Sequence, residues 1–279
     1  MEIFYTIAAI SEYLNSKRLL NNYIGFVPTM GALHNGHLSL IKIASGQTQL
    51  VVCSIFVNPT QFTNRKDLAN YPKPIDEDIA RLIKADCDVL FLPSISEMYG
   101  DDEHWQIDLG QLDKKLEGQV RPGHSQGVTQ IINKLFNTVK PDKAFFGQKD
   151  YQQFLVIKEM VEQLKIDVKL IMCPIIREED GLAMSSRNIY LSAEEHQHAL
   201  ILHRVLLKVK NSFDKKSIEN LRLEAAQKLK SADGIELEYF EICNGDNLET
   251  VHSKDYKNLV ALVAAKVGQT RLIDNMILG

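Results

Sequence analysis

The first two-thirds of the chain alternates short apolar stretches with longer amphipathic stretches, and this alternation restricts the fold more than any other feature. The apolar stretches have the length of buried strands, and the amphipathic stretches have the spacing of helices. The expected strands cover residues 24–27, 50–57, 89–92, 143–146 and 168–173, and the expected helices cover residues 38–46, 75–85, 129–139 and 151–164. Buried strands separated by helices are joined in parallel. The sequence therefore predicts an α/β fold with a doubly wound parallel sheet.

The pattern changes after Pro174. A polar segment, residues 177–188, leads into two expected helices at 193–210 and 217–230, and short strand-like stretches follow at 236–243, 259–264 and 270–274. We therefore expect a Rossmann-like domain over residues 1–175 and a smaller α+β domain over residues 176–279. Because the polar segment joins the two domains, it has the position of a mobile lid.

Composition excludes several classes of protein. The chain has 279 residues, is 45% hydrophobic and carries a net charge of −4, whereas duplex nucleic-acid binders normally present a basic surface. Its four cysteines are widely spaced and form no Cys-x-x-Cys pair, which argues against disulfides and a zinc site and favours the cytoplasm. The N-terminus lacks signal-peptide features, and the apolar run at 51–57 is too short to span a bilayer. We expect neither a nucleic-acid nor a membrane partner.

Two histidines lie three residues apart where the expected strand at 24–27 turns into a helix. Residues 28–37 read Pro-Thr-Met-Gly-Ala-Leu-His-Asn-Gly-His, so His34 and His37 are expected to share one helical face. A helix start also offers unpaired backbone N–H groups, which bind anionic oxygen. Gly36 lets a nucleobase approach the backbone. The turn is a candidate nucleotide site; a solvated helix start and part of a metal site are the alternatives.

Three further polar segments lie where ligand loops are expected, since ligands bind beyond the carboxyl ends of parallel strands. Residues 58–62 (Asn-Pro-Thr-Gln-Phe) can hydrogen-bond a small polar substrate, although Asn-Pro is also a simple turn signal. Residues 147–153 (Gly-Gln-Lys-Asp-Tyr-Gln-Gln) offer a cation for phosphate and a carboxylate for ribose, or else a capped helix with a solvated lysine. Residues 181–188 (Gly-Leu-Ala-Met-Ser-Ser-Arg-Asn) offer hydroxyls and a guanidinium for polyphosphate.

The order and joint placement of these motifs resemble the pantothenate synthetase (pantoate–β-alanine ligase) family of the HIGH-type nucleotidyltransferase superfamily. The matching blocks are residues 28–37, 56–62, 121–124 (Arg-Pro-Gly-His), 149–153, 184–188 and 271–275 (Arg-Leu-Ile-Asp-Asn). Together they cover essentially the whole chain. Two positions depart from the family pattern: Ser125 replaces a usual aromatic residue, and Gln148 replaces a common glutamate. These departures bear on local loop packing rather than on the reaction.

The resemblance implies a ligase that condenses (R)-pantoate with β-alanine to pantothenate through a pantoyl adenylate, releasing AMP and pyrophosphate from ATP. It also implies a homodimer and Mg²⁺ on the phosphate oxygens, with no protein ligand to the metal assigned. His34, His37 and Lys149 are the implied catalytic residues. The residues implied to bind ATP are Met30, Gly31, Ala32, Leu33, His34, Asn35, Gly36, His37, Gly147, Gln148, Lys149, Asp150, Ile176, Met184, Ser185, Ser186 and Arg187. Gln61, Gln153 and Met30 are assigned to pantoate, and Gln61 also to β-alanine.

Other functions stay open at this point. Another member of the superfamily would transfer AMP or CMP to a phosphorylated acceptor, but it would normally pair the histidine turn with a different second signature. A catalytically silent nucleotide-binding regulator is disfavoured by the intact polar motifs, and a tRNA synthetase is disfavoured because no basic anticodon-binding module is evident. Three histidines of the expected helix at 193–210, His196, His198 and His203, fit a solvated helix face better than a metal site.

Overall fold

The computed structural model describes residues 1–100 and 103–278. Contacts within the chain divide it into two compact units. The first contains Met1–Gly147 and Gln153–Cys173, and the second contains Gln148–Gln152 and the chain from Pro174 onward. The sequence-based division after residue 175 did not separate the segment Gln148–Gln152 from the N-terminal part. This segment groups with the second unit because side chains there hydrogen-bond it, including the Asn275 amide.

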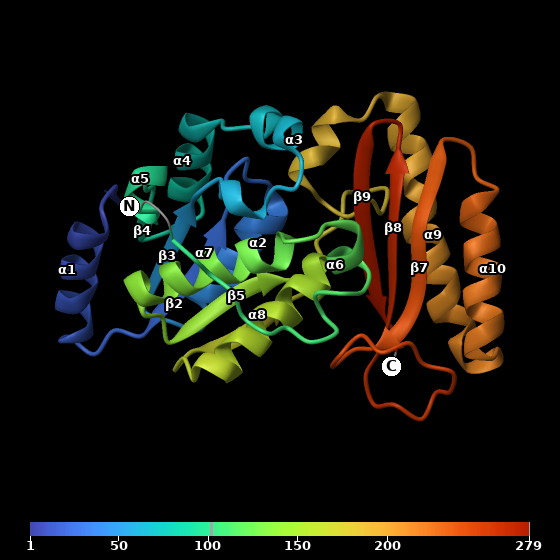
Figure 1. Ribbon diagram of the computed structural model, residues 1–279. Helices are drawn as coiled ribbons and strands as arrows, with labels where there is room; N and C mark the ends of the chain where they lie inside the picture. Colours follow the sequence, from blue (N-terminus) through green and yellow to red (C-terminus); the bar gives the residue numbers. More distant parts are fainter. Residues whose placement is uncertain (101–102, 279) are drawn as a thin grey trace. The chain divides into compact units, whose positions relative to one another are not determined.

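The first unit is built on a six-stranded parallel sheet, which confirms the predicted doubly wound fold (Figure 1). Its strands are β1 (Glu2–Phe4), β2 (Ile24–Thr29), β3 (Leu50–Ile55), β4 (Val89–Phe91), β5 (Lys143–Gly147) and β6 (Lys169–Cys173), in the order β1-β4-β3-β2-β5-β6. The chain builds outward from β2 to β3 and β4 on one side, and to β5 and β6 on the other. The order therefore reverses between β2 and β5, where open α/β sheets bind ligands.

Helices cover both faces of this sheet. The helices of the first unit are α1 (Ile7–Arg18), α2 (Asn35–Ser45), α3 (Arg65–Asn70), α4 (Ile75–Lys84), α5 (Ile95–Met98), α6 (Glu117–Val120), α7 (His124–Val139) and α8 (Tyr151–Leu164), with a 3-10 helix η1 (Pro59–Gln61). Phe26 packs with α1, α7 and α8, whereas the next residue, Val27, packs with α2 and α4. Successive strand side chains point to opposite faces, so each strand contributes to two cores.

The elements that the sequence did not predict have few buried apolar residues. In α1 only Ile10 and Leu14 are fully buried, which is too sparse for a clear helical pattern. Strand β1 has three residues. Helix α7 begins at His124, five positions before the predicted residue 129. The sequence did not predict this first turn because its buried residues include the polar His124 and Ser125. Hydrophobic periodicity does not detect such a start.

The second unit contains a three-stranded antiparallel sheet with helices α9 and α10 packed against it (Figure 1). Its elements are the 3-10 helices η2 (Gln148–Asp150), η3 (Ser186–Tyr190) and η4 (Phe213–Lys215), helices α9 (Ala193–Ser212) and α10 (Ile218–Lys230), and strands β7 (Ile235–Asn244), β8 (Leu259–Val267) and β9 (Thr270–Ile277). One hydrophobic core joins the two helices to the three strands. The predicted smaller α+β part is confirmed.

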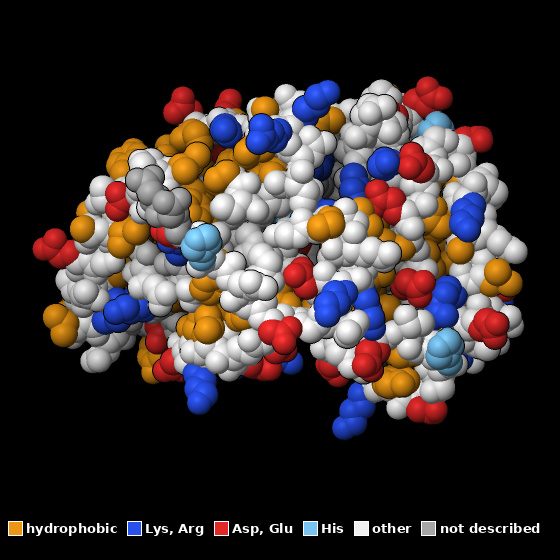
Figure 2. Space-filling view, viewed as in Figure 1, with side chains coloured by type: hydrophobic (Ala, Val, Ile, Leu, Met, Phe, Trp, Pro, Cys, Tyr) orange, Lys and Arg blue, Asp and Glu red, His pale blue; other side chains and the backbone are white. Residues whose placement is uncertain are grey.

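The charged surface is mixed in sign. On the face shown in Figure 2, lysine and arginine side chains are interspersed with aspartate and glutamate over both units. This distribution matches the small net charge of −4. Among the described residues, no helix has the length and apolar character needed to cross a membrane.

Candidate active site

The turn after β2 is held by a buried carboxylate that the sequence did not reveal. Gly31 and Ala32 both have positive φ, +82° and +49°, so the backbone reverses sharply after Met30. Asp78 of α4 is fully buried, and its two oxygens accept hydrogen bonds from the Ala32 and Leu33 N–H groups, each at 2.7 Å. Burial raises the pKa of Asp78, and the two backbone hydrogen bonds act in the opposite direction. In sequence, this residue looked like an ordinary acid of a helix first turn.

His34 and His37 lie together after this turn, with ring centroids 4.0 Å apart. His34 is the N-cap of α2, and its Nδ1 accepts the Gly36 N–H at 3.1 Å. His37 Nδ1 accepts the His34 N–H at 3.3 Å. A ring nitrogen that accepts a hydrogen bond carries no proton, so in both rings Nε2 bears the N–H. Both histidines are therefore hydrogen-bond donors through Nε2.

This geometry corrects one expectation about the turn. The predicted anion site relied on unpaired backbone N–H groups at the helix start, but His34 caps the Gly36 N–H and the His37 N–H donates to the His34 carbonyl. His34 precedes the helix rather than sharing a helical face with His37. The imidazole Nε2–H groups, rather than these two amides, are the donors that the turn presents.

Gln61 and Met30, two residues assigned to pantoate, are in contact. Gln61 Nε2 lies 3.0 Å from Met30 Sδ, and Gln61 Oε1 accepts a hydrogen bond from Asn58 Nδ2 at 3.1 Å. Asn58, 1% exposed, also donates to the Gly127 carbonyl and accepts from the Tyr99 hydroxyl at 2.6 Å. Asn58 therefore orients the Gln61 amide, a function that the Asn-Pro turn signal did not reveal.

Helix α7 supports the same segment. His124 Nδ1 lies 2.8 Å from the Gln61 carbonyl oxygen, and the Arg121 guanidinium lies near both groups. A Cβ on Gly127 would lie 2.4 Å from the Thr60 carbonyl oxygen, so only glycine allows η1 to pack this closely on α7. The Arg-Pro-Gly-His motif thus supports the Gln61 segment structurally.

The end of β5 carries the other residues of the first unit that were assigned to ligands. Among the described residues, no heavy atom lies within 4 Å of the position that a Cβ of Gly147 would occupy, so the space beside this backbone is open. Gln153 is half-buried in the first turns of α8, shortly after this strand. Since β5 pairs in parallel with β2, these residues and the histidine turn follow the same edge of the sheet.

In the second unit, Lys149 lies in η2 and its Nζ is 3.8 Å from Asp150 Oδ1. The Asn275 side chain of β9 donates to the carbonyl oxygens of Gln148 and Lys149, at 2.9 and 3.0 Å, and accepts from Gln148 Nε2 at 3.0 Å. The backbone that carries the lysine is therefore fixed to a strand.

The polar segment that contains Met184, Ser185, Ser186 and Arg187 is closed by hydrogen bonds of its own. The Met184 N–H donates to the Ile176 carbonyl, and the Ser185 hydroxyl accepts the Arg187 N–H to cap η3. Arg177 forms a two-pronged ion pair with Asp274 of β9, at 2.6 and 2.9 Å. Within the second unit these hydrogen bonds hold the segment to itself and to β9.

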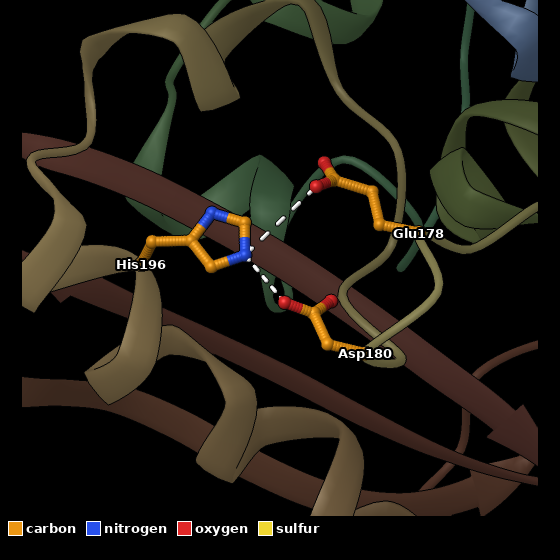
Figure 3. Close-up of side chains that lie close together, drawn as sticks. All are labelled: Glu178, Asp180 and His196. Carbon is orange, nitrogen blue, oxygen red and sulfur yellow. Dashed lines mark hydrogen bonds and ion pairs between the residues drawn. The ribbon is translucent and has the colours of Figure 1, made fainter.

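The histidines of α9 contact neighbouring loops instead of forming a solvated face. His196 Nε2 lies 2.7 Å from Asp180 Oδ2 and 3.9 Å from Glu178 Oε2 (Figure 3). This hydrogen bond lowers the pKa of Asp180. His203 packs beneath Gly181, and its pKa is lowered by burial and by the Arg177 charge. These contacts hold the segment around residues 178–181 on α9.

Comparison with known proteins identifies the chain. The family model for pantoate-beta-alanine ligase matches residues 2–277. The chain belongs to the pantoate–β-alanine ligase family. A pantothenate synthetase from Thermotoga petrophila is 47% identical to it, and the alignment covers 100% of both chains. This membership confirms the predicted enzyme class and its activity, the ATP-dependent ligation of pantoate and β-alanine.

Solved structures of this ligase family share the fold. The crystal structure of pantothenate synthetase from Thermus thermophilus matches with a TM-score of 0.94 at 37% identity, covering 99% of each chain. A pantoate–β-alanine ligase from Francisella tularensis, complexed with β,γ-ATP and β-alanine, matches with a TM-score of 0.80 at 35% identity, covering 99% of this chain and 97% of that one.

Proposed function

We propose that the ligase works in two steps through a pantoyl adenylate. A carboxylate is a poor acylating group because its oxygen is a bad leaving group. A carboxylate oxygen of (R)-pantoate therefore attacks the α-phosphorus of ATP, and the bond to pyrophosphate breaks. The β-alanine amine then attacks the acyl carbon. The bond from this carbon to the oxygen that joins it to phosphorus breaks, AMP leaves with that oxygen, and the new amide nitrogen loses a proton. No enzyme nucleophile is needed, so positioning and charge stabilisation supply the rate.

The paired histidines carry the first part of this proposal. Their Nε2–H groups are fixed as donors by the backbone N–H groups that bond each Nδ1. We assign these donors to the β- and γ-phosphate oxygens, where negative charge grows as pyrophosphate departs. Of the two, we assign the proton donation to His37.

The other proposed ATP contacts come from the second unit, from the end of β5 and from the turn after β2. Lys149, Ser185, Ser186 and Arg187 are assigned to the phosphates, and Gly147 and Asp150 to the ribose. Met30, Gly36, Ile176 and Met184 are assigned to adenosine. The Ile176 carbonyl and the Met184 N–H already bond each other, so this pair serves as a rigid wall.

Pantoate is assigned to the Gln61 and Gln153 amides, with Met30 as an apolar wall, and Gln61 is also assigned to β-alanine. The Met30–Gln61 contact and the Asn58 hydrogen bond support a pre-oriented amide at this place. An amide can bond both hydroxyl and carboxylate oxygens, as pantoate requires.

We assign Mg²⁺ to the phosphate oxygens of the substrate, with water completing its coordination. Among the described residues, the group of side chains close enough to share a metal ion is Glu178, Asp180 and His196. Mg²⁺ prefers oxygen ligands, and this group includes the imidazole of His196. The imidazole is also hydrogen-bonded to Asp180, so the group does not suit Mg²⁺.

Pantoate-dependent exchange of pyrophosphate into ATP tests the first step. His37→Ala and Lys149→Ala should each lower the exchange rate by about 10²–10³-fold while keeping the fold, because each removes an aimed donor. AMP release should require pantoate, β-alanine and ATP together, whereas exchange should not need β-alanine. Normal exchange in either variant would contradict its assigned role, and exchange driven by a phosphorylated acceptor would favour the other nucleotidyltransferases.

We further propose that the chain is a cytoplasmic homodimer. The family resemblance supports the dimer. All four cysteines are buried, and no disulfide joins any of the residues that the structure describes, which agrees with a reducing compartment.

A further inference from the structure

Two consecutive residues of strand β9, Asp274 and Asn275, each anchor a different segment of the second unit. They are 4% and 2% exposed. Neighbouring side chains of a strand point to opposite faces, so adjacent positions can bind different partners. One of these segments carries Lys149, and the other leads into residues 185–187, to which phosphate binding is assigned above.

Asn275 fixes the first segment through its side-chain amide. It makes three hydrogen bonds of 2.9–3.0 Å to Gln148 and Lys149, two of them to main-chain carbonyls. These bonds set the direction of the backbone from which the lysine side chain extends. A buried amide with both donor hydrogens and its oxygen engaged strongly resists displacement.

Asp274 fixes the second segment through Arg177. The two-pronged ion pair is joined by a bond from the guanidinium to the Gly181 carbonyl, at 3.1 Å. Arg177 also pairs with Ala183 in an isolated β-bridge, directly before Met184. The Asp274 Oδ1 accepts the Asn275 N–H at 2.7 Å, which couples the two anchors.

We infer that Asp274 and Asn275 are positioning residues for adenylation, because they hold both phosphate-binding segments on one strand. They act through Lys149 and the loop and do not touch substrate. This inference rests on the proposed role of Lys149. A displaced lysine no longer meets the phosphates, so pyrophosphate departure is affected while attack by β-alanine on a finished adenylate is spared.

The experiment compares the two half-reactions in Asn275→Ala and Asn275→Asp. The second variant keeps the volume and the acceptor for Gln148 but removes both donations to the carbonyls. Exchange should fall by about 10²-fold in both, whereas β-alanine should consume chemically prepared pantoyl adenylate within about twofold of the wild-type rate. Arg177→Lys, which loses the two-pronged geometry, should show the same division.

Met276→Ala is the matched control, since this neighbouring residue packs against the core of the second unit. It should leave both half-reactions near wild type at a temperature where the protein is folded. The Lys149→Ala/Asn275→Ala double variant should be no slower in exchange than Lys149→Ala, because residues that act as a unit are not additive.

The outcomes separate this inference from the proposed function. Normal exchange in Lys149→Ala would contradict the assigned role of the lysine and the inference together. Slow exchange in Lys149→Ala with normal exchange in Asn275→Asp would overturn the inference alone. A parallel loss of both half-reactions, or a multiplicative loss in the double variant, would also overturn it, since either shows a general structural effect.

Discussion

Single residues at this site owe their properties to neighbours that are distant in sequence. The Asp78 carboxylate reaches a turn 45 and 46 positions earlier in the chain, where it accepts hydrogen bonds from the Leu33 and Ala32 N–H groups. The two histidine rings, in contrast, are held by backbone N–H groups within four residues, the His34 ring by Gly36 and the His37 ring by His34. The turn after β2 is thus stabilised both by hydrogen bonds within residues 34–37 and by a carboxylate from α4.

Asp78→Asn should destabilise the turn, because an amide offers one acceptor oxygen where two N–H donors converge. We expect a loss of about 1–3 kcal/mol in the free energy of unfolding and a higher KM for ATP. Asp76→Asn, an exposed acid in the same helix turn, is the control and should change neither. Denaturant unfolding and steady-state kinetics measure both; a wild-type stability in Asp78→Asn would refute the supporting role.

Two buried thiols make stability depend on alkaline pH. Burial raises the pKa of Cys87 to about 12 and that of Cys173 to about 11, from an ordinary value of 9.0. Above pH 9.0 the unfolded chain loses these protons while the folded chain keeps them, so the free energy of unfolding falls as pH rises toward the folded pKa values. Denaturant unfolding across this range should give a smaller slope for Cys173→Ala; an unchanged slope would argue against the thiol.

At the scale of elements, the site depends on close packing between a helix and a short 3-10 turn. Helix α7 supports η1 through Gly127, and η1 places Gln61 beside Met30. The two elements are joined by the Asn58 side chain, which bonds both the Gln61 amide and the Gly127 carbonyl. The position of Gln61 is therefore set by the spacing between α7 and η1.

Gly127→Ala should displace η1, because the new Cβ would lie 2.4 Å from the Thr60 carbonyl oxygen and 2.6 Å from the Gln61 nitrogen. We expect kcat/KM for pantoate to fall on the order of 10- to 100-fold, since a shift of about 1 Å at a positioning residue has this effect. Gly46→Ala, whose Cβ would meet only ordinary contacts at 3.6 Å and beyond, is the matched control. Equal pantoate kinetics in the two variants would contradict the proposed support.

In the whole molecule, each of the two units carries a different set of the predicted site residues. The first unit places the histidine turn after β2 and Gln153 after β5, at the reversal point of a parallel sheet, and Gln61 after the neighbouring strand β3. The second unit holds Lys149 and the polar loop on an antiparallel sheet. Each unit has a hydrophobic core of its own, so each can keep its part of the machinery rigid.

The proposed homodimer predicts a particle of twice the 31.6 kDa chain mass in sedimentation equilibrium. The mass should persist over a dilution series in the micromolar range if the dimer is obligate. A species with the mass of a single chain and full ligase activity would show that the monomer suffices.

The fold class and the family could be predicted from the amino-acid sequence alone, and the site residues were assigned from it. Strand and helix periodicities depend only on neighbouring residues. The motifs at 28–37, 58–62, 147–153 and 184–188 are likewise short, and their polar side chains are visible in the sequence. The boundaries were less certain where polar residues are buried, as at the start of α7. Such boundaries depend on tertiary packing of polar residues, which hydrophobic periodicity does not detect.

The way in which these residues are held depends on contacts between parts of the chain that are distant in sequence. The Asp78 support, the Asn58–Gly127 bond and the Asn275 anchor join residues separated by 45, 69 and 127 positions. Each involves a polar side chain that, in sequence, resembles an ordinary helix acid, turn residue or strand residue. Their roles follow from burial, because an amide or carboxylate enclosed by the fold must find its partners there.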